Sequence, residues 1–351
     1  TPSWLETELL GEILESVYKN FTVDRDAEIS MEVNPGTVTA ESLALYRRAG
    51  INRLSIGCQS TDDGELERIG RIHTFAQFLD TYRWAREAGF DNINVDLMNA
   101  LPGQTIADAE RNLERILALD PAPEHVSVYS LIVEEETPFY EMYERGELEL
   151  PDEDLEREMY WRTAGILKKY GYEHYEISNF AREGYRCRHN CGYWKRQEYL
   201  GFGIGAASLY GEVRFTNTRD LERYLACIRM EPNADSWTEL NAEFCKGLYE
   251  ESDAESYTDQ FLEKLPEENS GMLSVADRMA ETMFLGLRMS DGVNKELFEQ
   301  QFGEPIEKIY GKEIAESVEE GLLEEHAGRL ILTKRGIDVS NYVMVKFLAE
   351  S

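Results

Sequence analysis

Apolar residues follow two alternating periodicities along the first 134 residues of the chain. Short apolar runs predict strands, and the stretches between them, with apolar side chains three and four positions apart, predict helices. The expected strands are 29–33, 53–58, 92–97 and 125–131, and the expected helices are 40–49, 75–88 and 106–118. Thr39 and Thr105 are the expected N-caps of the first and last of these helices. This alternation builds a parallel sheet, so we expect an α/β fold with a partial or complete (β/α) barrel.

The pattern changes after Pro151. A helix at about 154–170 leads into a block rich in tyrosine and tryptophan, and an acidic stretch with proline and glycine then indicates an insertion or linker. From Ser274 onward, three helical segments, a hairpin and a last helix suggest a winged-helix-like unit in an α+β C-terminal region. The expected domains are a partial barrel at 1–150, its extension at 151–230, the acidic insertion at 231–272 and the C-terminal unit at 273–351.

Composition excludes several classes of partner. The 351 residues carry 36 basic and 68 acidic side chains, a net charge of −32, which repels nucleic acid and anionic membranes. No apolar run is long enough to span a bilayer, so we expect no transmembrane segment. Five cysteines in a long chain without a signal-peptide pattern indicate free thiols and a cytoplasmic location.

Polar residues stand where the expected strands end. Glu32, Gln59 and Asp96 occupy three such positions, and Arg71 lies in the loop after Gln59. Active sites of barrels form at the carboxyl ends of the strands. Carboxylates and an amide suit hydroxyl and ammonium groups, and an arginine can bind a carboxylate through two hydrogen bonds. This set suits a small zwitterion that carries a ribose, although scattered polar groups at a barrel mouth would give the same spacing.

A second feature is the segment from Arg186 to Trp194, which combines a histidine, two cysteines and two large aromatic residues. An imidazole can ligate the iron of a porphyrin, and flat aromatic rings can cover the macrocycle. The alternative is an ordinary hydrogen-bonded core histidine at His189. Cys187 and Cys191 have the spacing of the first half of a CxxxCxxC loop, but the third position is Trp194, so we expect neither an iron–sulfur cluster nor a zinc site here.

Together these segments resemble the HemW-type family of radical S-adenosyl-L-methionine (SAM) proteins, which are similar to oxygen-independent coproporphyrinogen III oxidase. Members of this family act as heme chaperones. The resemblance runs from residue 1 to the C-terminus, with 231–272 matching poorly. The segments that carry it are Thr1–Ser3, Glu32–Thr37, Asn52–Ser60, Gly70–His73, Asp96–Thr105, Tyr175–Phe180, His189–Trp194 and Gly286–Arg288.

The resemblance implies roles for individual residues. Thr1 would contact the methionyl group of SAM and Arg71 its carboxylate. The ribose and ammonium groups would be held by Glu32, Gln59 and Asp96. Heme would be bound by the segment that contains His189, Asn190, Tyr193 and Trp194.

The family also holds a 4Fe–4S cluster through a CxxxCxxC loop ahead of a glycine-rich segment, and that loop is not in this sequence. The chain begins at Thr1, which matches the end of the glycine-rich segment. We therefore expect that a first strand and the cluster loop precede Thr1 in the intact protein. The chain by itself is expected to run no radical chemistry.

Two main functions follow from the resemblance. The first is a cytoplasmic heme chaperone that binds heme and SAM and passes heme to an acceptor protein. The second is a radical SAM enzyme of porphyrin biosynthesis that decarboxylates propionate side chains of coproporphyrinogen III. The His-Asn-x-x-Tyr-Trp segment favours the chaperone, because the oxidase branch is expected to lack it. An inert fragment is a third and weaker alternative.

Overall fold

The computed structural model describes residues 2–229 and 267–348. The chain divides into two compact units, Thr1–Cys191 and Gly192–Ser351, which are described one at a time. The expected boundary after residue 150 does not separate these units, because the following helix and hairpin extend the first sheet.

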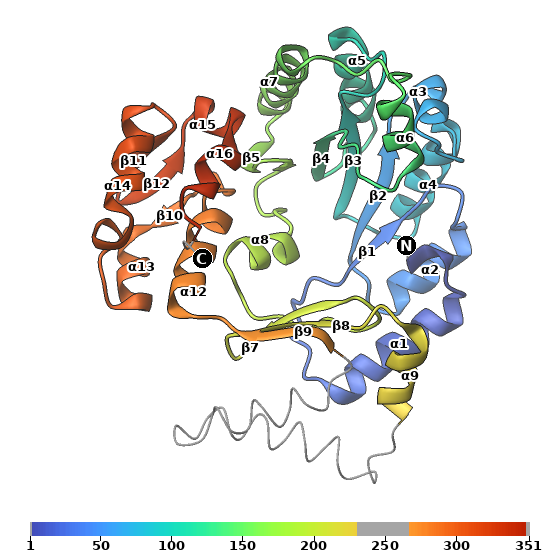
Figure 1. The fold of residues 1–351 in the computed structure, drawn as a ribbon. Helices are drawn as coiled ribbons and strands as arrows, with labels where there is room; N and C mark the ends of the chain where they lie inside the picture. The colour runs from blue at the N-terminus through green and yellow to red at the C-terminus, as the bar shows by residue number, and fades with distance from the viewer. Residues whose placement is uncertain (1, 230–266, 349–351) are drawn as a thin grey trace. The chain divides into compact units, whose positions relative to one another are not determined.

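The first unit is built on a six-stranded sheet in the order β1-β2-β3-β4-β6-β5 (Figure 1). The four strands expected from the sequence are confirmed and run parallel, as in a partial (β/α) barrel. They are β1 (Ser30–Val33), β2 (Arg53–Gln59), β3 (Ile93–Asn99) and β4 (His125–Ser130). A hairpin of β5 (Glu173–Glu176) and β6 (Asn179–Ala181) completes the sheet, with β6 antiparallel to β4.

The expected helices are also confirmed. They are α2 (Ala40–Arg48), α4 (Phe75–Glu87), α5 (Ile106–Leu117) and α7 (Glu153–Lys169), preceded by α1 (Thr7–Asn20). The side chains of Thr39 and Thr105 accept hydrogen bonds from backbone N–H groups three residues later, as N-caps do. Three further helices, η1 (Pro2–Trp4), α3 (Asp63–Arg68) and α6 (Pro138–Glu144), are too short to show a helical period in the sequence.

The two faces of the first sheet differ in polarity. On β2, Leu54 and Ile56 are fully buried in the hydrophobic core, whereas the alternate residue Ser55 is only half-buried. Helices α4 and α5 pack on this sheet at β2 and β3. Parallel strands are usually apolar on both faces because both are covered. The polar alternation here means that the inner face lines a cavity instead of a packed core.

The second unit contains an antiparallel sheet of β7 (Ala207–Tyr210), β8 (Val213–Asn217) and β9 (Glu267–Met272), together with α9 (Leu221–Arg229). The expectation of an insertion or linker up to residue 272 is wrong for its last part. Residues 267–272 form a strand that pairs with β8, Val213 opposite Met272. The remainder of the expected insertion, 231–266, lies outside the described residues.

The C-terminal part of the second unit has the expected winged-helix-like arrangement. Helices α12 (Val275–Gly286), α13 (Lys295–Phe302) and α14 (Ile306–Glu319) are combined with a three-stranded antiparallel sheet. The strands are β10 (Val293–Asn294), β12 (Arg329–Leu332) and β11 (Leu323–His326), in that order. Two short helices, α15 (Lys334–Asp338) and α16 (Ser340–Val345), replace the single last helix that the sequence suggests.

Candidate functional site

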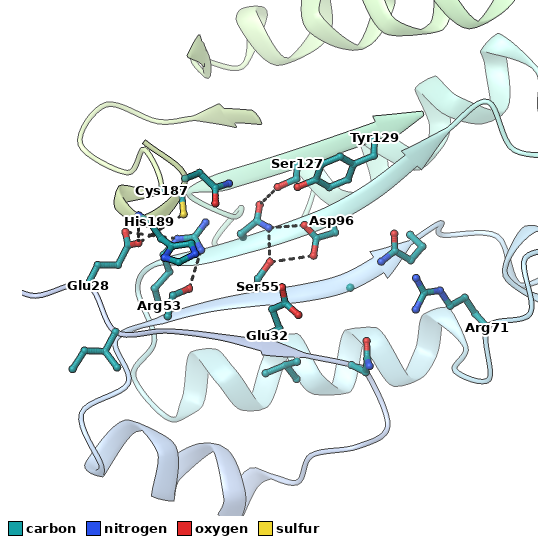
Figure 2. A pocket seen from close by; sticks show the side chains of 18 residues that line it. Glu28, Glu32, Arg53, Ser55, Arg71, Asp96, Ser127, Tyr129, Cys187 and His189 are labelled. Carbon is teal, nitrogen blue, oxygen red and sulfur yellow. Dashed lines mark hydrogen bonds and ion pairs between the residues drawn. The ribbon is translucent and has the colours of Figure 1, made fainter. Parts of the chain in front are cut away.

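A cavity of about 750 Å³ lies along the inner face of the first sheet (Figure 2). Its volume is in the range of pockets that bind organic ligands. Glu32, Gln59, Arg71 and Asp96 all line it, and His189 and Asn190 line the same cavity. The structure therefore brings together six of the nine residues proposed from the sequence. Thr1 lies outside the described residues.

Gln59 is held in an unusual backbone conformation at the carboxyl end of β2. Its φ is 65°, and the pairing of β2 with β3 shifts register between Gly57 and Gln59. Such bulges and left-handed residues often redirect a side chain at a functional site. Gly57 lines the cavity beside it, and a Cβ added there would lie 3.0 Å from Gln59 Nε2. A side chain at position 57 would therefore occupy space that the cavity keeps open.

Asp96 on β3 is fixed by two neighbouring polar residues. Ser55 donates a hydrogen bond to its Oδ2 (3.1 Å), and Asn94 Nδ2 donates to its Oδ1 (2.8 Å). Burial raises the pKa of Asp96, these hydrogen bonds oppose the rise, and the charge of Glu32 adds to it. Two carboxylates that face one cavity favour a cationic ligand, because the ligand's charge relieves their repulsion.

Arg71 lies at one end of the cavity, in the loop after α3 (Figure 2). Its backbone N–H donates to Leu66 O (2.9 Å), and Gly70 before it takes a left-handed φ of 71°. A ring nitrogen of the buried His73 lies 3.2 Å from Cys58 O, which ties the far end of the loop to β2. The loop thus holds a guanidinium at the cavity edge, where it can bind a carboxylate through two hydrogen bonds.

A hydrogen-bond chain runs from Asp96 toward the other end of the sheet. Asn94 Oδ1 lies 2.6 Å from His125 Nδ1, and His125 Nε2 lies 2.8 Å from the Tyr175 hydroxyl. With the amide oxygen accepting, His125 Nδ1 must donate, so Nε2 accepts from Tyr175. Burial, reinforced by the charge of Arg53, lowers the pKa of His125 well below its usual value, which keeps the ring neutral. Tyr175 in turn accepts from the backbone N–H of Cys187 (3.3 Å).

The end of the cavity that lies at the amino ends of the strands is called its amino end, and the opposite end its carboxyl end. Glu28, which lies two residues before β1, makes the main contacts at the amino end. Its carboxylate accepts hydrogen bonds from the backbone N–H groups of Arg188 (3.1 Å) and His189 (3.4 Å) at the start of α8 (Arg188–Trp194). Glu28 Oε2 also lies 4.0 Å from Arg53 Nε. Figure 2 shows His189, Arg53 and Glu28 together at the end of the cavity opposite Arg71. One carboxylate therefore holds the candidate heme histidine in place.

The remaining candidate heme residues, Tyr193 and Trp194, belong to the second unit. The ring of Tyr193 lies 4.5 Å from that of Tyr199 in an edge-on arrangement. The guanidinium of Arg288 lies 4.3 Å from the centre of the Trp194 ring, a cation–π contact. His189 and Asn190, which belong to the first unit, line the cavity.

Two cysteines of the first unit, Cys58 and Cys187, are buried. Cys58 is fully buried, and burial raises its pKa well above the usual value. Cys187 donates to Glu28 Oε1 (3.7 Å), and burial raises its pKa as well. Within residues 2–229 and 267–348, no three His, Cys, Asp or Glu side chains form a group that could hold a metal ion.

Eight polar residues that line the cavity were missed by the sequence analysis: Glu28, Ser30, Asn34, Arg53, Ser55, Asn94, Ser127 and Tyr129. The alternation of apolar and polar residues along β2, β3 and β4 was the signal that could have identified Ser55, Asn94 and Ser127. No comparable local pattern distinguishes Glu28, which precedes its strand.

Comparison with known proteins assigns the class of this fold and site. The model of the radical SAM superfamily matches residues 5–116, and the model of the HemN C-terminal domain matches 273–339. Coproporphyrinogen III oxidase (HemN) from Escherichia coli, described as a radical SAM enzyme, has the same fold, with a TM-score of 0.74 at 20% identity. That similarity covers 99% of this chain and 75% of the oxidase. The chain is a radical SAM protein with a HemN-type C-terminal domain.

Full-length relatives define the family further. The heme chaperone HemW of Bacillus subtilis is 34% identical over 351 residues, which is 100% of this chain and 84% of the relative. HemW of Lactococcus lactis is 34% identical over 350 residues, or 83% of its own length. The chain belongs to the HemW family. Membership in the radical SAM superfamily implies SAM and a 4Fe–4S cluster as cofactors.

Proposed function

We propose that this protein is a heme chaperone, which binds heme at the amino end of the cavity, binds SAM at the carboxyl end and transfers heme to an acceptor protein in the cytoplasm. The observation that carries the proposal is the placement of His189. Helix α8 sets this exposed histidine on the wall of a 750 Å³ cavity, where its ring faces the pocket in Figure 2. An imidazole in this position is a suitable ligand for heme iron.

At the carboxyl end, the proposed contacts follow from charge. Arg71 binds the carboxylate of SAM. Glu32 and Asp96 face its cationic centres and ribose hydroxyls, and Gln59 can donate hydrogen bonds to these groups or accept them. SAM supplies a sulfonium group whose activation is the chemistry of the superfamily. The polar inner face and the open space beside Gly57 support this placement.

Hemin titration followed through the Soret band tests the heme proposal. Wild-type protein is expected to bind hemin in a saturable manner, and His189→Ala is expected to shift the Soret maximum and weaken binding about tenfold or more, as loss of an axial ligand should. His326→Ala is the matched control, because His326 is an exposed histidine on β11 that does not line the cavity. Equal spectra and affinities for His189→Ala and wild type would reject His189 as the ligand.

The alternative function is an oxidase similar to HemN that acts on coproporphyrinogen III. The fold is compatible with it, but the relatives that match over the full chain include proteins named heme chaperones. Anaerobic incubation of cluster-containing protein with coproporphyrinogen III distinguishes the two. The chaperone proposal expects no decarboxylated product, and stoichiometric or catalytic product formation would favour the oxidase.

Two further parts of the proposal concern the cell. No helix within the described residues is long and apolar enough to cross a membrane. The acceptor is expected to be a heme-binding protein, and transfer can be followed by loss of the Soret signal from the loaded chain when apo-acceptor is added.

A further inference from the structure

Arg53 is a buried cation with no assigned part so far in either heme binding or SAM binding. Only 5% of its side chain is exposed, yet it lines the amino end of the cavity. Its Nη1 donates to Ser30 Oγ (3.0 Å), but its Nε has no hydrogen-bond partner. A buried donor without a partner is costly, and in native proteins such a group often marks a ligand site.

Glu28 compensates the charge of Arg53 only in part. The closest approach of the two side chains is 4.0 Å, which is beyond hydrogen-bonding distance. The oxygens of Glu28 are already engaged with the backbone N–H groups of Arg188 and His189. Arg53 thus retains positive charge at the cavity wall, where it lowers the pKa of Cys187 against the larger, opposite effect of burial.

The cavity therefore has an arginine at each end, with Glu32 and Asp96 between them (Figure 2). Arg71 is assigned to the carboxylate of SAM. Arg53 lies beside His189 in Figure 2, and its hydrogen-bond partner Ser30 lines the same cavity, as does Asn190. A guanidinium next to a potential iron ligand fits a molecule that carries both a metal and a carboxylate.

We propose that Arg53 binds a propionate carboxylate of the heme that His189 approaches, and so makes the amino end of the cavity selective for porphyrins with free propionates. This inference rests on the proposed heme-binding function. Arg53 is a specificity-determining residue in this scheme, and Glu28 positions both it and His189. The incoming carboxylate would supply the acceptor that the Arg53 guanidinium lacks.

Selectivity between hemin and hemin dimethyl ester tests this assignment. The ester keeps the iron and the macrocycle but has no carboxylate charge. Both are titrated in the same detergent-containing buffer against wild type, Arg53→Gln and Arg53→Lys. Wild type is expected to bind hemin about tenfold or more tightly than the ester, because a hydrogen bond to a charged group is lost. Arg53→Gln should reduce this ratio to near one, and Arg53→Lys should retain part of it.

Arg86→Gln is the control for removal of an internal guanidinium. Arg86 is largely buried against Glu124 (3.0 Å) in the same unit but does not line the cavity. The ratio of hemin affinity to ester affinity in Arg86→Gln should therefore equal that of wild type. A ratio of affinities within one protein does not depend on how much of that protein is folded. Equal binding of hemin and ester by wild type, or an unchanged ratio in Arg53→Gln, would overturn the assignment. Failure of wild type to bind hemin at all would overturn the chaperone proposal itself.

Discussion

At the carboxyl end of the cavity, Gln59 and Asp96 stand on neighbouring strands that follow one another in the chain. At the amino end, by contrast, the backbone N–H of His189 donates a hydrogen bond to Glu28, which lies 161 residues earlier in the chain. The carboxyl end is a product of regular (β/α) geometry, in which successive strands deliver their last residues to the same edge. The amino end depends on one long-range contact between the start of β1 and helix α8.

This difference has consequences for how each end responds to mutation. The side chains at the carboxyl end are positioned by strands such as β2 and β3, whose residues Leu54, Ile56 and Val95 are fully buried in the hydrophobic core. Changing one of them should alter ligand binding and leave the fold intact. At the amino end, Glu28 joins two elements, so its loss should affect the structure as well as the ligand. Three predictions test this contrast.

The largest effect is expected for Glu28→Ala. Removing one partner of a buried charge pair leaves Arg53 uncompensated and frees two backbone donors, so the free energy of unfolding should fall by about 3 kcal/mol. Urea denaturation measures this, and hemin binding should weaken in the same variant. The matched control is Asp26→Asn, whose side chain is 86% exposed beside Arg188 and should change stability by less than about 0.5 kcal/mol. Equal stability of the two variants would show that Glu28 does not anchor α8.

The second effect concerns Arg71→Ala. Loss of a charged hydrogen-bonding partner should weaken SAM binding about tenfold or more, because such contacts contribute about 1.5–3 kcal/mol. Calorimetric titration of SAM into the protein, after anaerobic reconstitution with iron and sulfide, measures it. Arg68→Ala on α3 is the control, since Arg68 is exposed and does not line the cavity. Hemin affinity should stay unchanged in Arg71→Ala, and a parallel loss of both ligands would contradict the division of the cavity into two ends.

The smallest effect is on the pH dependence of SAM binding. Because burial raises the pKa of Asp96, its carboxylate takes up a proton at a higher pH than an ordinary aspartate does. Protonation removes the charge that faces a cationic ligand, so SAM affinity should decline as the pH is lowered from about 8 to about 5. Asp96→Asn should bind SAM more weakly at the upper pH and lose most of this slope. A slope that persists in Asp96→Asn would assign the dependence to another group, with Glu32→Gln as the next variant.

Much of the carboxyl end could be predicted from the sequence. The apolar periodicities identified four parallel strands, and the rule that active sites form at strand ends then selected Glu32, Gln59 and Asp96. Arg71 followed because it lies in the connection that leads away from the second of these strands. These four residues line one cavity in the structure, and local patterns together with one general property of parallel sheets were enough to group them.

The amino end could not be predicted in this way. Arg53 begins a strand and Glu28 precedes one, and neither position is distinguished by spacing or by local composition. The sequence analysis treated His189 to Trp194 as one heme-binding segment. In the structure His189 and Asn190 line the cavity, and Trp194 contacts Arg288. Which side of a short helix faces a cavity depends on its anchoring, and here the anchor is a carboxylate 160 residues earlier.

The sequence by itself determined the four parallel strands of the barrel, the polar residues at its carboxyl end and the presence of a histidine in an aromatic segment, because these depend on periodicity and on residue type. Only the tertiary structure decided that this histidine shares one cavity with Glu32, Gln59 and Asp96 and that a buried arginine lies beside it. Those facts depend on hydrogen bonds and charges between segments far apart in the chain, whose pairing no local pattern specifies.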